Sequence, residues 1–476
     1  MLNNKSHVLV TLMIGTSMAA IDSSIVNVSL PLIQRQFAAP LDEVSMVITA
    51  YMITFLLFIP LTNWLKSSIG YYRLYIGSII VFMAGSLFCS LATDLSMLIG
   101  ARVAQAIGGG AIAPTSLAIL SETFPKEERG SAIGWWGIGN VMGPALGPTL
   151  GGVLTQYLGW ESIFYVNIPV GIVAVIMATR YLRFLKSRPR TFPRFDITGY
   201  LLFAGFIVLL QFTMSNASSR FGFLSWQFMC GVALTLLALW LFLRSARRPE
   251  PLLDLSVFKT AAFNRAFIII AIRSLALFGG MFFLPFLLQG LLGYTAVQSA
   301  LLLLPNALVM LLTRPVAGRL ADKGMIRQIS VLGIIVLSAS FVLLARIDIG
   351  TAVWFIVLAM VVRGLGISLL ISPVSTALLN AVTPAQTPTA TSLNSLMIQL
   401  GGSIGIAISG SMHTYISDYY TSRHHSPQVA EHYALQDGFL FTAVLILLTL
   451  IPAWKLPQKV SIRRLRSKIK ARQVMG

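Results

Sequence analysis

Ionisable side chains inside the long apolar stretches of this sequence are rare, and they are the residues best placed to do chemistry. We find four of them, namely Asp22, Arg102, Arg273 and Arg363. A charged group at the centre of a membrane helix costs about 2.5–3.5 kcal/mol on insertion scales, so each should face a cavity or a partner.

Asp22 is the acid of this set, and its depth suits a pair with Arg102. At 1.5 Å per helical residue, Asp22 lies ~12 Å and Arg102 ~9 Å from the outer ends of their predicted helices. A neighbouring cation favours the carboxylate, whereas desolvation favours the neutral acid, so a change in access could move the balance. We therefore predict that Asp22 binds and releases a proton and that Arg102 tunes its proton affinity. The alternative is a static ion pair that only fixes helix packing.

Arg273 and Arg363 then have no acid left to pair with. They either bind backbone carbonyls or line a cavity that attracts an anionic solute. Other polar residues within the apolar stretches are further cavity candidates, although hydrogen bonding between helices explains each of them equally well. These further candidates are Asn27, Gln105, Gln289, Asn394 and Gln399.

The elements that must position these residues are membrane-spanning helices. The chain has 476 residues, of which 56% are hydrophobic and 11% charged, whereas soluble domains carry roughly a quarter charged residues. A bilayer core of ~30 Å needs about 20 apolar residues in a helix. This rule predicts an all-α integral membrane protein with about fourteen spans. The spans are expected near 8–30, 44–64, 73–93, 96–119, 130–154, 162–182, 197–215, 223–243, 262–290, 297–317, 328–346, 351–373, 392–415 and 437–455.

The net charge of +19 is a topology signal rather than a sign of nucleic-acid binding. If the N-terminus is inside, most lysines and arginines, among them Arg314 and the basic tail, fall in inner loops. Few fall in outer loops. The positive-inside rule then places both termini in the cytoplasm. We expect the protein in the cytoplasmic (inner) membrane. The lipid bilayer is thus a predicted partner and nucleic acid is not.

A weak internal repeat divides the spans. The segment Asn63–Arg73 follows the second span, and the related segment Gly318–Arg327 follows the tenth. Two related inner-loop segments imply two related six-helix halves. We expect an N-terminal half at 1–190, an inserted pair of helices at 191–250, a C-terminal half at 251–456 and a basic cytoplasmic tail at 457–476.

Five motifs in order resemble one family. They are the segment Asp22–Pro31 (similar to L-D-x-T-I-V-N-V-A-L-P), the segment Arg102–Gly108 (R-x-x-Q-G-x-G), Gly139 with the Gly-Pro-rich segment Gly143–Gly152, the set Trp160, Phe164, Asn167, Pro169 and Gly171 (W-R-x-x-F-x-x-N-x-P-x-G), and the set Gln289, Gly293, Tyr294 and Pro305. The chain is identified as a member of the major facilitator superfamily, in its fourteen-span drug:proton antiporter branch of the EmrB/QacA type. The resemblance covers nearly the whole chain.

The resemblance assigns roles to two further groups of residues. The first group is the antiporter motif, whose small residues stand four apart and let another helix approach closely. In the resembled family this motif limits leakage. A packing face without a role in transport is the alternative. The motif residues are Gly139, Gly143, Pro144, Gly147, Pro148, Gly151 and Gly152. A conformational latch is expected at Ser67, Gly70, Arg73, Gly318, Asp322 and Lys323. Ser67 stands where the family has an aspartate, so the first half of this latch is in doubt.

We therefore expect a secondary active transporter that exports small amphipathic or drug-like molecules in exchange for protons. An exporter of one metabolite, such as a siderophore or organic acid, and a transporter-like sensor are the alternatives. No glycine is followed by lysine, which excludes the usual phosphate-binding loop, so a proton gradient is expected to supply the energy without a cofactor. Neither a metal site nor an enzymatic constellation is expected. A monomer is expected, and a periplasmic adaptor with an outer-membrane channel is left open for a Gram-negative cell.

Overall fold

The computed structural model describes residues 2–39, 41–186, 194–216, 225–248, 251–424 and 426–457. All regular structure in these ranges is helical. Apolar segments in lipid must satisfy their backbone hydrogen bonds internally, and a helix does so within one segment.

Long helices occupy every predicted span. The first group is α1 (Leu2–Phe37), α2 (Leu41–Phe58), α3 (Leu61–Ser90), α4 (Leu95–Thr123), α5 (Arg129–Leu158), α6 (Ser162–Tyr165), α7 (Asn167–Tyr181) and the 3-10 helix η1 (Arg183–Leu185). Next come α8 (Ile197–Asn216) and α9 (Trp226–Ser245). The second group is η3 (Leu255–Lys259), α10 (Ala261–Pro285), the π-helix η4 (Phe286–Leu291), α11 (Ala296–Asp322), α12 (Ile326–Leu344), α13 (Val353–Asn380), η5 (Pro384–Gln386), α14 (Thr387–Ser422), α15 (Pro427–Leu448) and α16 (Leu450–Trp454).

Twelve helices of the described chain are long and apolar enough to cross a membrane. The remaining two predicted spans lie on α2, whose apolar part is Met46–Phe58, and on α5, which has 30 residues. The fold class is thereby confirmed. Several boundaries were wrong. The predicted span 44–64 runs past the end of α2 at Phe58 and into α3, which begins at Leu61. The segment 416–436 between the last two predicted spans is largely helical, because α14 continues to Ser422 and Pro427 begins α15 after the cap Ser426.

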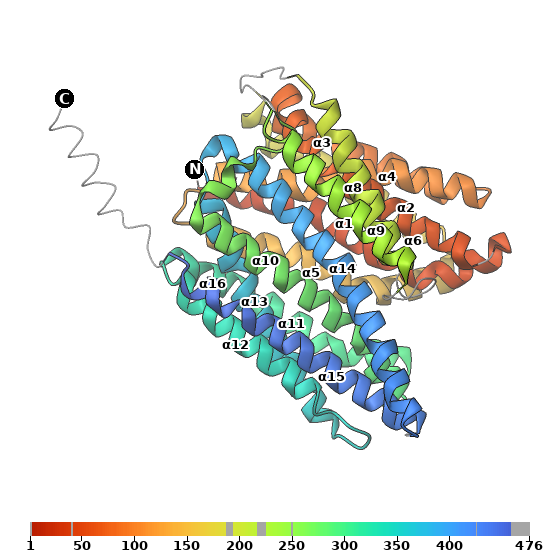
Figure 1. The fold of residues 1–476 in the computed structure, drawn as a ribbon. Helices are drawn as coiled ribbons and strands as arrows, with labels where there is room; N and C mark the ends of the chain where they lie inside the picture. The colour runs from red at the N-terminus through yellow and green to blue at the C-terminus, as the bar shows by residue number, and fades with distance from the viewer. Residues whose placement is uncertain are drawn as a thin grey trace.

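The helices pack in two groups that meet along a common interface (Figure 1). Helices α1, α3, α4, α5 and α7 pack together in the first group, and α10 to α15 pack together in the second. The groups contact each other mainly through α5 with α11, and also through α4 with α14. Helix α1 begins and α16 ends at the same end of the molecule, as an even number of crossings requires (Figure 1).

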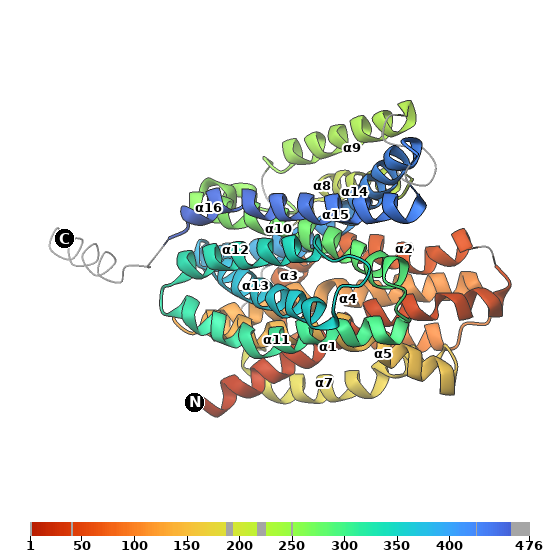
Figure 2. The same cartoon turned by 90° about the horizontal axis from the view of Figure 1, so that it is seen from below.

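Helices α8 and α9 pair with each other at the side of the bundle. Helix α8 packs on α2 and α14, whereas α9 lies at the margin of the molecule (Figure 2). This is the position expected for a pair inserted between two halves. The predicted boundaries at 190 and 250 fall outside the described residues and stay predictions, as does the tail at 457–476 beyond its first residue.

Candidate functional site

Asp22 lies at the centre of a buried polar cluster drawn from four helices. Its Oδ2 accepts a hydrogen bond from Arg102 Nη1 at 2.7 Å. Its Oδ1 accepts from Gln105 Nε2 at 2.8 Å and from Asn167 Nδ2 at 2.9 Å. Both amides also donate to Ser86 Oγ, at 2.6 and 3.2 Å. Because Asp22 is 0% exposed, these donors replace water as the partners of its carboxylate. We call these five residues the acid site.

Arg102 is held on its other side by the aromatic ring of Tyr51. Its guanidinium carbon lies 3.9 Å from the ring centroid, within the range of a cation–π contact. Its Nη1 also donates to Gln105 Oε1. The Tyr51 hydroxyl is buried and has no hydrogen-bond partner in the described structure. The predicted pairing of Asp22 with Arg102 is thus present, and the proton-transfer role stays a prediction.

Three members of this environment were missed as site residues from the sequence. Asn167 was noted as part of a family motif, and its spacing gave no sign that it would reach Asp22. Ser86 and Tyr51 lie in ordinary apolar stretches of α3 and α2. A polar residue every third or fourth position on α4, as at Arg102 and Gln105, was the one available signal that a polar face pointed inward.

The antiporter motif packs α5 against α1, the helix that carries Asp22. Side chains at Gly139, Gly143 and Gly147 would collide with Ser17, Ala20 and Ser24 of α1 respectively. Ser24 Oγ donates to the Gly143 carbonyl at 2.8 Å. These contacts fit the predicted close approach of two helices. The other motif residues are Gly151, which is buried, and Gly152, which has open space around it, while the side chains of Pro144 and Pro148 lie outside the described part.

A second series of glycines on α5 faces α11, and the sequence did not indicate it. A side chain at Gly130 would meet Gly318 and Asp322, one at Gly134 would meet the backbone of Arg314, and one at Gly137 would meet the Arg314 guanidinium. Helix α5 therefore contacts the acid-site helix with one face and the other helix group with a second face.

The end of the molecule where α5 begins is closed by contacts between the two helix groups; we call it the closed end. The Asp322 carboxylate accepts hydrogen bonds from the backbone N–H groups of Gly130 at 2.6 Å and Ser131 at 2.7 Å. These are the first residues of α5, so the carboxylate also meets the positive end of the helix dipole. Arg129 Nη1 donates to Asn380 Oδ1 at 2.9 Å, at the end of α13.

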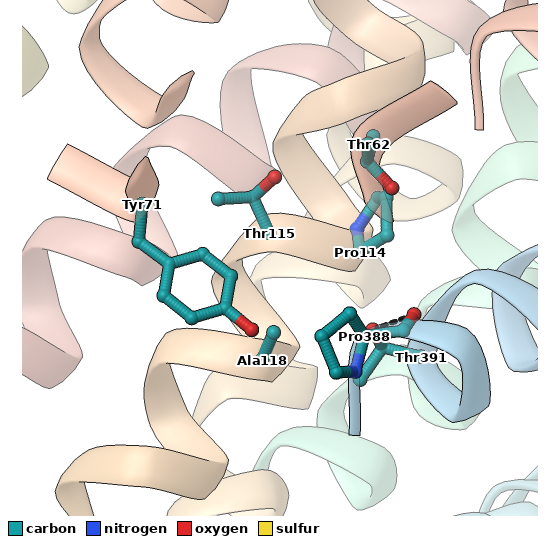
Figure 3. Close-up of a pocket in the computed structure, with 7 residues that line it drawn as sticks. All are labelled: Thr62, Tyr71, Pro114, Thr115, Ala118, Pro388 and Thr391. Carbon is teal, nitrogen blue, oxygen red and sulfur yellow. Dashed lines mark hydrogen bonds between the residues drawn. The ribbon is translucent and has the colours of Figure 1, made fainter. Parts of the chain in front are cut away.

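The start of α14 adds to the closed end. Thr62 Oγ1 and Ser392 Oγ are 3.1 Å apart, and Asn63 Nδ2 donates to Thr389 Oγ1 at 3.4 Å. Figure 3 shows the small pocket beside these contacts, which is lined by α3, α4 and α14. Its lining residues are Thr62, Tyr71, Pro114, Thr115, Ala118, Pro388 and Thr391.

The residues of the predicted latch differ in their contacts, and the latch itself stays a prediction. Gly318 packs directly on Gly130, and Asp322 makes the contacts just described, whereas Lys323 is exposed. Ser67 Oγ donates within its own helix to Asn63 at 3.2 Å. Gly70 breaks α3 with a φ of 78°, and Arg73 is exposed. The serine at 67 therefore makes no described contact with the second helix group.

The predicted cavity residues do not form a single cluster. Gln105 belongs to the acid site, Gln289 is exposed on η4, and Gln399 is partly buried with its Nε2 3.9 Å from Met52 Sδ. Asn394 is buried, and its Oδ1 has no partner in the described structure. The side chain of Asn27 lies outside the described part.

Arg273 and Arg363 are buried as predicted, and a third arginine joins them. Arg314 was expected in an inner loop, and this was wrong. It lies inside α11, is 4% exposed, and donates from Nη1 to the Gly137 carbonyl of α5. The positive-inside count misassigned it because α11 continues two turns beyond the arginine, to Asp322.

Two groups of membrane-spanning helices that meet along one interface are the arrangement of a multi-pass membrane transporter. A model of the Major Facilitator Superfamily matches residues 12–406, and the chain belongs to this superfamily. It is a transporter of small molecules and not an enzyme. The family resemblance predicted from the motifs is confirmed.

Similar proteins support the same assignment. The chain is 31% identical over 438 residues to the uncharacterized MFS-type transporter YhcA of Bacillus subtilis (strain 168), covering 91% of this chain and 80% of that protein. It is 29% identical over 411 residues to the multidrug export protein EmrB of Escherichia coli (strain K12), covering 85% and 79% respectively. The structure of the human organic anion transporter MFSD10 (TETRAN) matches with a TM-score of 0.68 at 13% identity over 94% of this chain and 99% of that chain, and shows the fold alone.

Proposed function

We propose that the chain is an exporter of small amphipathic or drug-like molecules in the cytoplasmic (inner) membrane, driven by protons that enter in exchange. The observation that carries the proposal is the acid site, in which a fully buried Asp22 is bonded to Arg102. A buried acid with a cation partner in a membrane helix is a proton-binding arrangement. The multidrug function in the name of the EmrB relative supports a drug-like substrate.

The closed end suggests the direction of the cycle. By the positive-inside rule its loops face the cytoplasm, together with both termini. The described conformation is then closed toward the cytoplasm, with the Asp22 oxygens accepting hydrogen bonds from three side chains. A proton that arrives from outside would neutralise Asp22 and weaken its bond to Arg102. Helix α1 could then shift against α5, which carries the movement to the contacts with α11.

The other parts of the proposal concern the assembly, the energy source and the moving parts. We propose a monomer as the functional unit. In a Gram-negative cell a periplasmic adaptor and an outer-membrane channel would receive the exported molecule. The proton gradient takes the place of a cofactor, and the halves at 1–190 and 251–456 would rock against each other.

The test compares wild type with Asp22→Asn in proteoliposomes under an imposed pH gradient. We expect gradient-driven transport of a lipophilic drug by the wild type and its loss in the variant, since asparagine cannot bind and release the proton. Asp94→Asn is the matched control, because exposed Asp94 caps α4 through Met97 N and asparagine caps equally well. Undiminished transport by Asp22→Asn would remove Asp22 from the mechanism, and no transport of any solute by the wild type would favour a sensor.

A further inference from the structure

Three buried arginines of the second helix group have no acidic partner. Arg273 of α10, Arg314 of α11 and Arg363 of α13 are 2%, 4% and 6% exposed. Among the described residues no carboxylate forms an ion pair with any of them. The Nε atoms of all three, and Nη1 of Arg273, are buried donors without a hydrogen-bond partner in the described structure. An arginine keeps its charge inside a protein, so the cost of burying these donors persists until a partner arrives.

The acid site cannot supply that partner. Asp22 is the one buried acid of the described chain, and both of its oxygens already accept hydrogen bonds from Arg102, Gln105 and Asn167. The two helix groups therefore differ in charge. The first contains a balanced ion pair. The second contains buried positive charge that meets only a carbonyl, at Arg314, and the Phe341 ring, 5.9 Å from Arg363, in place of a carboxylate in the described structure.

The three arginines stand at successive positions along their helices. At 1.5 Å per residue, Arg314 is ~12 Å from the end of α11, Arg273 is ~18 Å from the start of α10, and Arg363 is ~25 Å from the end of α13. All three distances start from the closed end. Arg314 acts electrostatically on Arg273, and α13, which carries Arg363, packs on both α10 and α11.

We propose that Arg273, Arg314 and Arg363 bind the anionic group of the transported molecule, so that the preferred substrates are amphipathic carboxylic acids. This inference rests on the proposed export function and specifies its substrate class. Guanidinium groups bind carboxylates through paired hydrogen bonds. The same charges repel lipophilic cations, which gives the site its selectivity.

Arg314 links this binding to the conformational cycle. In the closed conformation it donates to the Gly137 carbonyl on α5. When α5 and α11 separate, this bond is lost and the arginine gains a free donor at the moment the site opens toward the cytoplasm. An acid entering from that side would restore the missing partner, so that substrate binding favours the open state.

The experiment uses matched molecules that differ only in charge. We would measure KM in proteoliposomes of neutral lipid under a pH gradient for an aromatic carboxylic acid, its methyl ester and a quaternary ammonium analogue. The wild type should prefer the acid. Arg273→Gln and Arg363→Gln should raise the KM of the acid at least about tenfold, the loss of roughly one charged hydrogen bond. The KM of the ester should change less than about twofold.

Two kinds of control make the result specific. Arg244→Gln removes an exposed arginine that stacks on Trp240, and should leave both KM values unchanged. Arg273→Lys keeps the charge and should recover part of the preference for the acid, with size-exclusion profiles showing that each variant is folded. Arg314→Gln should affect the acid in the same direction, with an additional effect on the closed end.

Each of the other possible outcomes contradicts either the arginine site or the proposed function. If the wild type transports the ester and the cation as well as the acid, and the glutamine variants leave all KM values unchanged, the arginine site is wrong while proton-driven export stands. If none of the three molecules is transported under a gradient, the proposed function fails first. If replacing chloride by gluconate, or adding anionic lipid, changes stability while the variants leave acid transport unchanged, the arginines hold a fixed inorganic or lipid anion and the inference is overturned.

Discussion

The buried carboxylate of Asp22 accepts hydrogen bonds from three protein side chains in place of water. Each of these donors is therefore expected to influence how Asp22 binds a proton. Arg102, Gln105 and Asn167 come from two different helices, and Ser86 joins the two amides. The scarcity of buried charges in the sequence was enough to find Asp22 and Arg102. It could not find Asn167 or Ser86, because neutral polar residues are common in membrane helices and their partners depend on helix rotation.

Asn167→Leu should move the pH at which transport is half-maximal to a higher value. The variant removes the hydrogen bond of 2.9 Å from Asn167 to Asp22, so the charged form of the acid site loses a partner. A hydrogen bond to a charged group contributes about 1.5–3 kcal/mol. The measurement is the pH profile of transport in proteoliposomes.

Thr16→Val is the control for this variant. It removes a buried hydroxyl from the helix of Asp22 that bonds to Leu12 and Trp136 rather than to the acid site. Its pH profile should match that of the wild type. Identical profiles for Asn167→Leu and the wild type would contradict a role of Asn167 at Asp22.

At the scale of elements, helix α5 depends on glycines on two faces. Apolar runs of about 20 residues were enough to predict the helices. Their polar extensions, as at the end of α14 and the start of α15, were missed because hydropathy ends at the bilayer while a helix need not. The glycines at 130, 134 and 137 were not predicted, because the family motif begins at Gly139 and its glycines at 139, 143 and 147 face α1.

Gly143→Leu should disturb the packing of α5 on α1. Its side chain would meet the backbone of Ala20, which cannot move aside as a flexible side chain could, and overpacking typically costs about 1–3 kcal/mol. We expect reduced yield of folded protein and loss of transport. Gly152→Leu is the matched control, because nothing lies within 4 Å of a Cβ added there. Equal loss in both variants would show that the effect is not one of packing against α1.

At the scale of the whole molecule, the conformation depends on contacts between the two helix groups at the closed end. The repeat in the sequence predicted that Asp322 would take part and that Ser67 would be the weaker member. It could not predict the partner, since the start of α5 lies nearly two hundred residues away from Asp322 in the chain.

Asp322→Ala should favour the open state. It removes two hydrogen bonds to the first turn of α5, and a loss of about 1.4 kcal/mol would already change the ratio of states tenfold. A cysteine at Ser392, which is buried against Thr62, serves as a reporter in a chain lacking Cys89 and Cys230. Labelling by a membrane-impermeant maleimide in inside-out vesicles should accelerate several-fold.

Asp348→Ala is the control, since this exposed carboxylate lies 3.7 Å from His432 and away from α5. It should leave the labelling rate of the Ser392→Cys reporter unchanged. A rate that stays at the wild-type value in Asp322→Ala would show that the carboxylate does not hold the closed end.

Helix α5 contacts α1, which carries Asp22, with one face and α11 with the other. Proton binding at Asp22 and separation of α5 from α11 are therefore linked equilibria that obey thermodynamic reciprocity. If proton binding at Asp22 weakens the α5–α11 interface by some factor, then weakening that interface must strengthen proton binding by the same factor. A covalent cross-link between α5 and α11 would therefore act as a competitor of the proton, although it would sit far from the carboxylate. Through α5, a measurement of the closed end then also reports on proton binding at the acid site, and a measurement of proton binding reports on the closed end.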